Sequence, residues 1–196
     1  MNPALLPDPL ILPPVIRSGP GRIDTLFDGA RGWGRRGCLV VGSSAVRSGL
    51  AARLLKMTPP GVHLERVEHA GGEPTLDQLD RLRATLRAGS TDWVAAVGGG
   101  SVMDLAKAAA GLAPSSLTSA AAFDGAAIEV DPLPFLAAPT TAGTGSEATI
   151  NAVLIDPRTR RKKSIRDPRW MPRYVILDPD LLRGCPAPVI ADSGLD

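Results

Sequence analysis

Short hydrophobic runs alternate with amphipathic stretches along most of this chain. Apolar runs of four to six residues predict strands, and apolar residues at three- and four-residue spacing predict helices. Strands are expected at residues 15–19, 38–41, 64–67, 92–97, 134–138 and 174–177. Helices are expected at residues 23–27, 45–56, 75–88 and 102–112. This alternation, joined by short glycine turns, predicts an α/β fold: an open, mostly parallel Rossmann-like sheet with helices on both faces.

Three segments depart from the alternation. Residues 152–155 and 163–165 flank a turn at Asp156–Thr159, which predicts an inserted β-hairpin. Residues 114–131 are rich in small side chains and show no helical or strand period, so they are expected to form a connection. Residues 1–14 are interrupted by prolines and are expected to form an N-terminal arm before the first strand.

Composition narrows the class of protein. The chain has 196 residues, of which 44% are hydrophobic and 21% charged, as in a globular domain that can bury a core. A net charge of +2 does not indicate nucleic-acid binding. No apolar run reaches the ~20 residues that cross a bilayer, and the N-terminus lacks the basic start of a secretory signal. A cytoplasmic protein is expected, and the excess of arginine over lysine is typical of a GC-rich bacterial genome.

Cysteine and histidine offer little metal or redox chemistry. Cys38 opens an apolar run and is expected to be a small buried hydrophobe, and Cys185 has no partner at a metal or redox spacing. His63 and His69 lie at the ends of the second strand outside any motif. Both are interpreted as ordinary strand-end residues rather than metal ligands.

Gly98–Asp104 form a strand-to-helix turn that could bind an anion. Ser101 is expected to cap the following helix, with Asp104 completing a capping box. Three consecutive glycines exceed what a turn needs, which favours a loop whose N–H groups and helix dipole bind a diphosphate. Lys107 follows Asp104 by three residues and could simply form an ion pair with it.

Residues 139–147, here called the threonine loop, follow another predicted strand. Their hydroxyl groups and glycine N–H groups offer donors without bulk, as a diphosphate and a ribose require. The two loops together predict a single phosphate-rich ligand held from two sides. Gly42–Ser44, after the strand at 38–41, lacks the Gly-x-Gly-x-x-Gly pattern of common dinucleotide sites. The diphosphate is therefore expected at Gly98–Ser101. The basic run at 160–163 has no interleaved aromatic residues, so it is interpreted as a solvated loop.

These motifs resemble the iron-containing (group III) alcohol dehydrogenases. The resemblance rests on Gly-Gly-Gly-Ser-x-x-Asp-x-x-Lys at 98–107, on the threonine loop and on Ser-Gly-Leu-Asp at 193–196, and it covers about residue 15 to the end. It implies an NAD(P)-binding α/β domain and a helical domain that holds Fe²⁺ or Zn²⁺. The implied reaction moves a hydride between the nicotinamide and a small primary alcohol or its aldehyde. Family members often form homodimers through the edge strand near Val15.

The resemblance also assigns roles to particular positions. Those expected to contact the cofactor surround the two loops, and the lysine among them approaches a ribose. They are Ser43, Gly99, Gly100, Ser101, Asp104, Thr140, Thr141, Thr144, Asn151 and Lys162. Many NAD-preferring relatives carry an aspartate after the first buried strand, where this chain has Gly42 and Ser43 with Arg47 one turn on. The missing carboxylate removes repulsion toward a 2′-phosphate, so NADP is an option beside NAD.

Asp196 matches the family's metal-binding aspartate, and no histidine follows it in this sequence. One carboxylate cannot complete a metal site. The expected organisation is an arm at 1–14, an NAD(P)-binding domain at 15–186 and the start of a truncated helical domain at 187–196. Such a chain is expected to lack turnover by itself. Two alternatives are a non-catalytic nucleotide-binding or regulatory module and a polyol dehydrogenase of the same superfamily.

Overall fold

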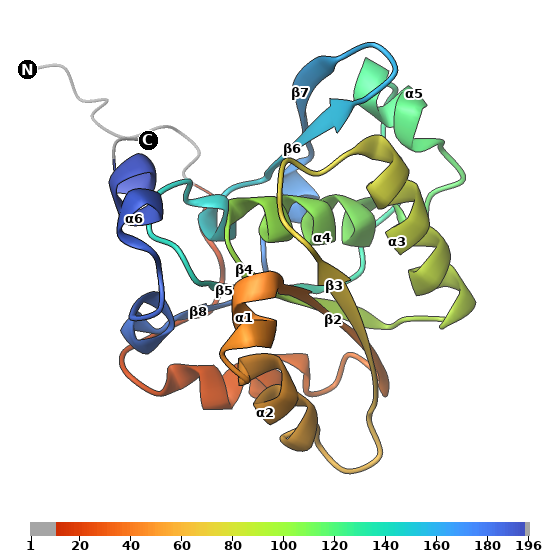
Figure 1. The fold of residues 1–196 in the computed structure, drawn as a ribbon. Helices are drawn as coiled ribbons and strands as arrows, with labels where there is room; N and C mark the ends of the chain where they lie inside the picture. Colours follow the sequence, from red (N-terminus) through yellow and green to blue (C-terminus); the bar gives the residue numbers. More distant parts are fainter. Residues whose placement is uncertain (1–10, 195–196) are drawn as a thin grey trace, which may run out of the picture.

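A parallel sheet of six strands forms the centre of the computed structural model, which describes residues 11–194 (Figure 1). The strand order is β1-β8-β5-β4-β2-β3, and every neighbouring pair is parallel. The strands are β1 (Ile16–Ser18), β2 (Arg36–Gly42), β3 (His63–His69), β4 (Trp93–Gly98), β5 (Phe135–Pro139) and β8 (Tyr174–Leu177). The sheet confirms the predicted Rossmann-like α/β fold.

Helices cover both faces of the sheet (Figure 1). The α-helices are α1 (Ser43–Arg47), α2 (Leu50–Lys56), α3 (Leu76–Ala88), α4 (Gly100–Leu112), α5 (Ser119–Asp124) and α6 (Ala187–Gly194). Short 3-10 helices are η1 (Arg22–Ala30), η2 (Ser146–Ala148), η3 (Pro168–Trp170) and η4 (Pro179–Leu182). One face of the sheet packs against α3 and α4, and the other packs against η1, α1 and α2.

The central strands β4 and β5 are apolar throughout because both of their faces are covered. In β4 all six residues are buried, and successive side chains enter opposite cores. Ala96 packs with α3 and α4, whereas Ala95 packs with η1, α1 and α2.

Thr75 begins α3 with a capping box, since its hydroxyl accepts from the Gln78 N–H and the Gln78 side chain accepts from the Thr75 N–H.

The single helix predicted at 45–56 was wrong, because the segment forms α1 and α2 with a break between them. Gly49 adopts a left-handed conformation with φ of 78°, which no helix interior contains and which glycine adopts at little cost. The prediction that residues 114–131 form only a connection was also incomplete, because they contain α5. Thr118 caps α5 by accepting from the Ala121 N–H, so a short helix forms within it.

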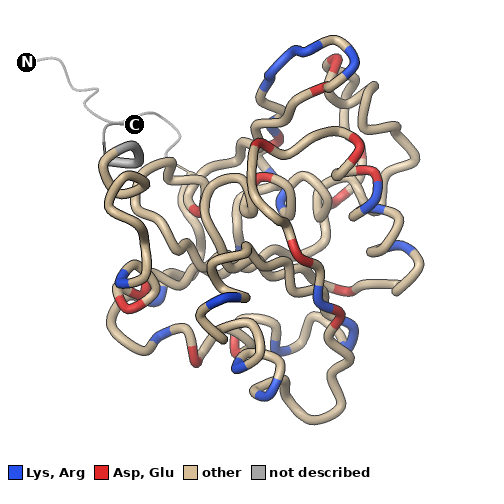
Figure 2. Tube along the Cα trace, in the orientation of Figure 1, with Lys and Arg blue, Asp and Glu red and all other residues tan. Residues whose placement is uncertain are grey.

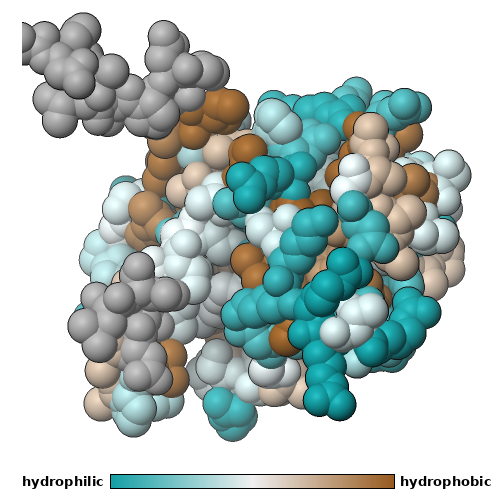
Figure 3. All heavy atoms as spheres, turned by 90° about the horizontal axis from the view of Figure 1, so that it is seen from above, coloured by the Kyte–Doolittle hydropathy of each residue, from teal (hydrophilic) through white to brown (hydrophobic). Residues whose placement is uncertain are grey.

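The predicted hairpin is confirmed as β6 (Asn151–Asp156) paired antiparallel with β7 (Arg161–Arg166). Ala152, Leu154 and Ile165 face the core over α4, so the hairpin packs on the helix layer. Seen from above, hydrophilic residues dominate the middle and right of the view, with small hydrophobic patches between them, and residues of intermediate hydropathy lie at the left (Figure 3). Within residues 11–194, no helix has both the length and the apolar character that crossing a membrane would require.

Candidate functional site

The order of the strands places a crevice at the carboxyl end of the sheet. The chain leaves β2 for β3 on one side and then crosses to β4 on the other side. In open α/β sheets, ligands bind outside the carboxyl ends of the strands at such a reversal. Here the exits of β2, β4, β5 and β8 meet at this edge, which brings together the turns at Gly42, Gly98 and Pro139.

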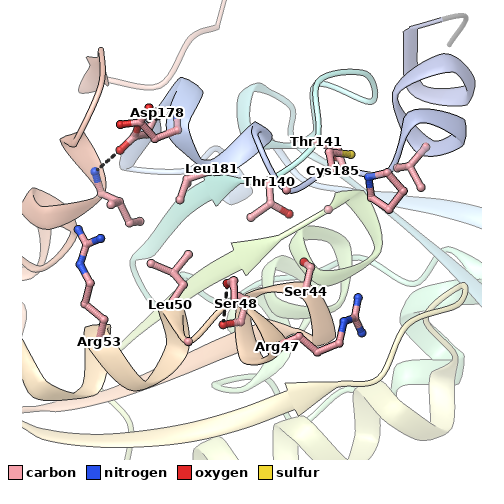
Figure 4. A pocket seen from close by; sticks show the side chains of 18 of the residues that line it. Ser44, Arg47, Ser48, Leu50, Arg53, Thr140, Thr141, Asp178, Leu181 and Cys185 are labelled. Carbon is pink, nitrogen blue, oxygen red and sulfur yellow. Dashed lines mark hydrogen bonds between the residues drawn. The ribbon is translucent and has the colours of Figure 1, made fainter.

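The first groove is a cavity of about 500 Å³ at this edge. One wall comes from α1 and α2, and the opposite wall comes from the exits of β5 and β8 and the segment that follows (Figure 4). Leu50 and Leu181 give it apolar surface, while Ser44 and Arg47 give it polar groups. Its mixed lining suits a flat heterocycle attached to a sugar.

The second groove, of about 940 Å³, lies on the other side of the glycine turn. Its lining is more polar than that of the first groove. It includes residues of the β3–α3 turn, the start of α4, the threonine loop and the β6–β7 hairpin, among them Glu73, Ser101, Thr144, Asn151 and Lys162.

The two grooves meet at Gly99 and Thr141, which line both of them, as does Val189 of α6. Among the described residues, the backbone N–H groups of Gly99, Gly100 and Ser101 have no hydrogen-bond acceptor. They lie at the N-terminus of the 13-residue helix α4, where the dipole favours an anion. This donor set fits the diphosphate of a dinucleotide whose two halves lie in the two grooves.

The capping box predicted for Ser101 was wrong. The N-cap of α4 is Gly99, and no side chain within residues 11–194 caps the helix. A side chain at Gly100 would also crowd the threonine loop, since its Cβ would lie 2.8 Å from Thr144 Oγ1. The first turn of α4 therefore presents bare backbone donors instead of a side-chain cap, which leaves them available to a ligand.

The structure brings most of the predicted cofactor-contacting residues together. Thr140 lines the first groove, Gly99 and Thr141 line both, and the rest line the second: Gly100, Ser101, Asp104, Thr144, Asn151 and Lys162. Ser43 is half-buried at the start of α1, and its neighbour Ser44 lines the first groove in its place.

Lys107 and Asp104 lie on α4 beneath the second groove. The ion pair between them that the spacing allowed as an alternative does not form: Lys107 is 1% exposed, and its ammonium donates to backbone carbonyls instead. Burial lowers the pKa of Lys107 to about 8. Burial also raises the pKa of Asp104 above its ordinary value, against the opposing effect of hydrogen bonds from Ser146 and Val153.

Basic residues gather at the turn of the β6–β7 hairpin (Figure 2). Arg161 pairs with Asp124 and Lys162 pairs with Glu73, each at 2.7 Å and each partly exposed. Such surface pairs contribute about 0–1 kcal/mol. Lys162 and Glu73 both line the second groove, so a ligand there can compete for the lysine.

Several lining residues were missed by the motif analysis. Asp178 follows β8 and is 3% exposed; its carboxylate accepts from the N–H groups of Gly21 and Ile23, joining the start of η1 to the edge of the sheet. Cys185 and Val189 also line the first groove, and both come from the segment that follows η4. Asp178 directly follows a predicted strand, so the rule that parallel strands end at one edge could have located it.

No metal site is assembled within residues 11–194, where no three His, Cys, Asp or Glu side chains come together. His63 and His69 are the first and last residues of β3, as expected of strand-end residues. Asp196, the predicted metal ligand, lies outside the described residues.

Comparison with known proteins agrees with this geometry. A family model described as iron-containing alcohol dehydrogenase matches residues 13–179. The chain is 35% identical over 187 residues to the probable alcohol dehydrogenase EutG of Escherichia coli (strain K12), covering 94% of this chain and 47% of that protein. It is 30% identical over 182 residues to lactaldehyde reductase of the same strain, covering 91% and 48%.

This chain is also similar to a protein of known structure, at a level of identity close to that of the two relatives above. The sulfoacetaldehyde reductase from Bifidobacterium kashiwanohense, in complex with NAD+, superposes with a TM-score of 0.88 and 33% identity, over 94% of this chain and 50% of that one. The chain spans about half the length of the curated relatives it matches. The family model covers most of the chain, and the relatives agree with it. This chain therefore belongs to the iron-containing alcohol dehydrogenase family.

Proposed function

We propose that this chain is the nucleotide-binding half of an NAD(P)-dependent alcohol dehydrogenase or aldehyde reductase. The observation that supports the proposal is the junction of two grooves at the backbone N–H groups of Gly99, Gly100 and Ser101, for which the described residues offer no acceptor. When bound, the nicotinamide supplies or accepts the hydride. The residues of this chain bind the cofactor and orient it.

In this proposal each part of the dinucleotide has its own place. The adenosine occupies the first groove, with its base against Leu50 and Leu181 and its ribose near Ser44. The diphosphate lies on the first turn of α4. The nicotinamide and its ribose occupy the second groove, where Asn151 and Lys162 offer polar contacts.

We further propose that residues 15–186 form the NAD(P)-binding domain and that residues 187–196 begin a helical domain, which in the family holds Fe²⁺ or Zn²⁺. The substrate proposed for the whole enzyme is a small primary alcohol or its aldehyde. For the chain alone we propose nucleotide binding without alcohol turnover. An assay of NAD(P)H formation from ethanol or propanol tests this, and measurable turnover by the purified chain would contradict it.

Calorimetric titration of the purified chain tests the binding proposal. ADP, NADH and NADPH are expected to bind with one site per chain. The more tightly held reduced dinucleotide is expected to bind at least about tenfold more tightly than ADP, because it fills both grooves. Absence of binding by all three at millimolar concentration would contradict the nucleotide function.

Arg47 is expected to recognise a 2′-phosphate. It lies on α1 one turn after Ser44, lines the first groove and forms no ion pair within the described chain. A guanidinium suits a phosphate dianion, whereas NADH offers it only a hydroxyl at that position. Arg47→Gln is therefore expected to weaken NADPH binding about tenfold and NADH binding less than about twofold.

Arg53→Gln is the matched control for this prediction. Arg53 also lines the first groove, but its guanidinium pairs with Asp24. The control should change the affinities for NADH and NADPH by the same factor. Equal losses of NADH and NADPH binding in Arg47→Gln would show that Arg47 does not read the 2′-phosphate.

Cys185 provides a label inside the first groove. Its side chain is half-buried there, whereas Cys38 is 0% exposed and burial raises the pKa of its thiol to about 12. Iodoacetamide at pH 8 is therefore expected to modify Cys185 and to spare Cys38. ADP at about ten times its Kd should slow the reaction about tenfold, because only the free protein reacts. Mass spectrometry of the alkylated peptides measures both, and an unchanged Cys185 rate would place the nucleotide elsewhere.

A further inference from the structure

Lys107 is a buried cation that binds residues lining the second groove, among them Thr149 and Asn151. It lies two turns into α4, is 1% exposed and is directed at the segment between the threonine loop and β6. Its ammonium nitrogen is 2.5 Å from the carbonyl oxygen of Ser146, 2.8 Å from that of Thr149 and 2.8 Å from that of Asn151. A lysine has three N–H donors, and three carbonyls from one short segment accept them.

Asp104 binds the same segment from one helical turn earlier. Its Oδ1 accepts from the Ser146 hydroxyl at 2.5 Å, and its Oδ2 accepts from the Val153 N–H at 2.9 Å. Both carboxylate oxygens are thus used within the protein. Together with Lys107, Asp104 attaches α4 to residues 146–153 through five hydrogen bonds of 2.9 Å or less, and the Lys107 ammonium also lies 3.3 Å from the hydroxyl oxygens of Ser146 and Thr149.

This attachment connects the two parts of the proposed dinucleotide site. The first turn of α4 holds the free N–H groups at Gly100 and Ser101, and its second and third turns hold the segment that includes Thr149 and Asn151. The distance between the diphosphate donors and the polar wall of the second groove is therefore set by a single rigid helix. Without the ammonium, the carbonyls that it binds would lose their donors in a largely buried place, and the segment would shift to reach water.

We propose that Lys107 and Asp104 are positioning residues for the nicotinamide half of the cofactor. They act through residues 146–153, which they hold at the correct distance from the diphosphate, and they do not contact the cofactor's adenosine half. The inference rests on the proposed nucleotide function. A purely structural role would instead lower stability and weaken all nucleotides by the same factor.

The experiment compares two ligands on each variant. ADP reports the first groove and the diphosphate turn, whereas the reduced dinucleotide that binds wild type more tightly, NADH or NADPH, reports both grooves. For Lys107→Met we expect the Kd of the dinucleotide to rise about tenfold or more and that of ADP to change less than about twofold. Ser146→Ala, which removes only side-chain hydrogen bonds to Asp104 and Lys107, should show a weaker loss of the same kind.

Arg83→Met is the matched control. Arg83 is also a buried cation, 4% exposed, and it donates to the carbonyls of Leu112, Ser115 and Leu117 at the opposite end of α4. Its loss should lower the melting temperature without changing the ratio of the two Kd values. If Arg83→Met changes that ratio as much as Lys107→Met does, the positioning role is refuted.

The remaining outcomes are also decisive. Equal weakening of ADP and dinucleotide by Lys107→Met, or no weakening of either, would overturn the inference. If Lys107→Met does not fold, Ser146→Ala decides: a selective loss of dinucleotide binding supports the positioning role, and an unchanged ratio refutes it. If wild type binds neither ligand, the nucleotide function itself fails, and the calorimetric titration of wild type shows this first.

Discussion

Gly99→Asp is expected to abolish the binding of ADP and both reduced dinucleotides while the protein keeps its fold. The new carboxylate would lie at the N-cap of α4, beside the N–H groups proposed to bind the diphosphate. Two like charges about 4 Å apart repel by about 4 kcal/mol at the effective dielectric constant near a protein surface. We therefore expect a loss of affinity of at least about 100-fold.

The fold should tolerate this change. A Cβ at Gly99 would approach only the Thr141 side chain, at an ordinary contact distance of 3.5 Å. Aspartate is also a favourable N-cap, which adds a few tenths of a kcal/mol to helix stability relative to glycine. Differential scanning fluorimetry should thus show an equal or higher melting temperature, and calorimetry should show no binding.

Gly99→Asn is the control for charge. Asparagine has nearly the same shape and also caps helices, but it does not repel a phosphate. It should retain much more affinity for ADP than Gly99→Asp does. Equal affinities in the two variants, or full affinity in Gly99→Asp, would show that the first turn of α4 does not bind the diphosphate.

Gly111→Ala should destabilise the protein although alanine is the better helix former. Gly111 lies inside α4, where alanine would otherwise add about 1 kcal/mol. However, a Cβ at this position would overlap the indole ring of Trp170, which is 2% exposed. Overpacking of a buried core costs about 1–3 kcal/mol or more, so the melting temperature should fall by several degrees, at about 2–4 °C per kcal/mol.

Thermal unfolding of three variants checks this prediction. Gly184→Ala is the control, since a Cβ there would meet no atom within 4 Å. Combining Gly111→Ala with Trp170→Leu should recover part of the lost stability, because the smaller side chain relieves the overlap. A melting temperature of Gly111→Ala at or above that of wild type would contradict the observed packing of Trp170 on α4.

Much of the fold could be predicted from the alternation of apolar runs and amphipathic stretches. A buried parallel strand such as β4 is apolar on both faces, so its sequence shows it directly. The break between α1 and α2 was missed because apolar spacing continues across it. The signal was Ser48–Gly49, since a glycine inside a helical pattern can mark an end as well as an interior position.

The candidate site could be predicted only where loops follow strands. Gly99 and Thr141 each follow a strand of the parallel sheet, so their meeting follows from the topology. The partners of Lys107 could not be predicted in this way. A helix pattern suggests partners three or four residues away, whereas its carbonyl acceptors lie 39 to 44 residues further along the chain. Buried cations are satisfied by tertiary contacts that no local spacing reveals.

A crystal structure of this chain with the more tightly bound reduced dinucleotide is the most direct measurement. We predict diphosphate oxygens within about 3.2 Å of the backbone nitrogens of Gly99, Gly100 or Ser101. The adenine should lie between Leu50 and Leu181, and the nicotinamide should lie in the second groove near Asn151. A diphosphate bound away from the first turn of α4, or a dinucleotide confined to one groove, would contradict the account.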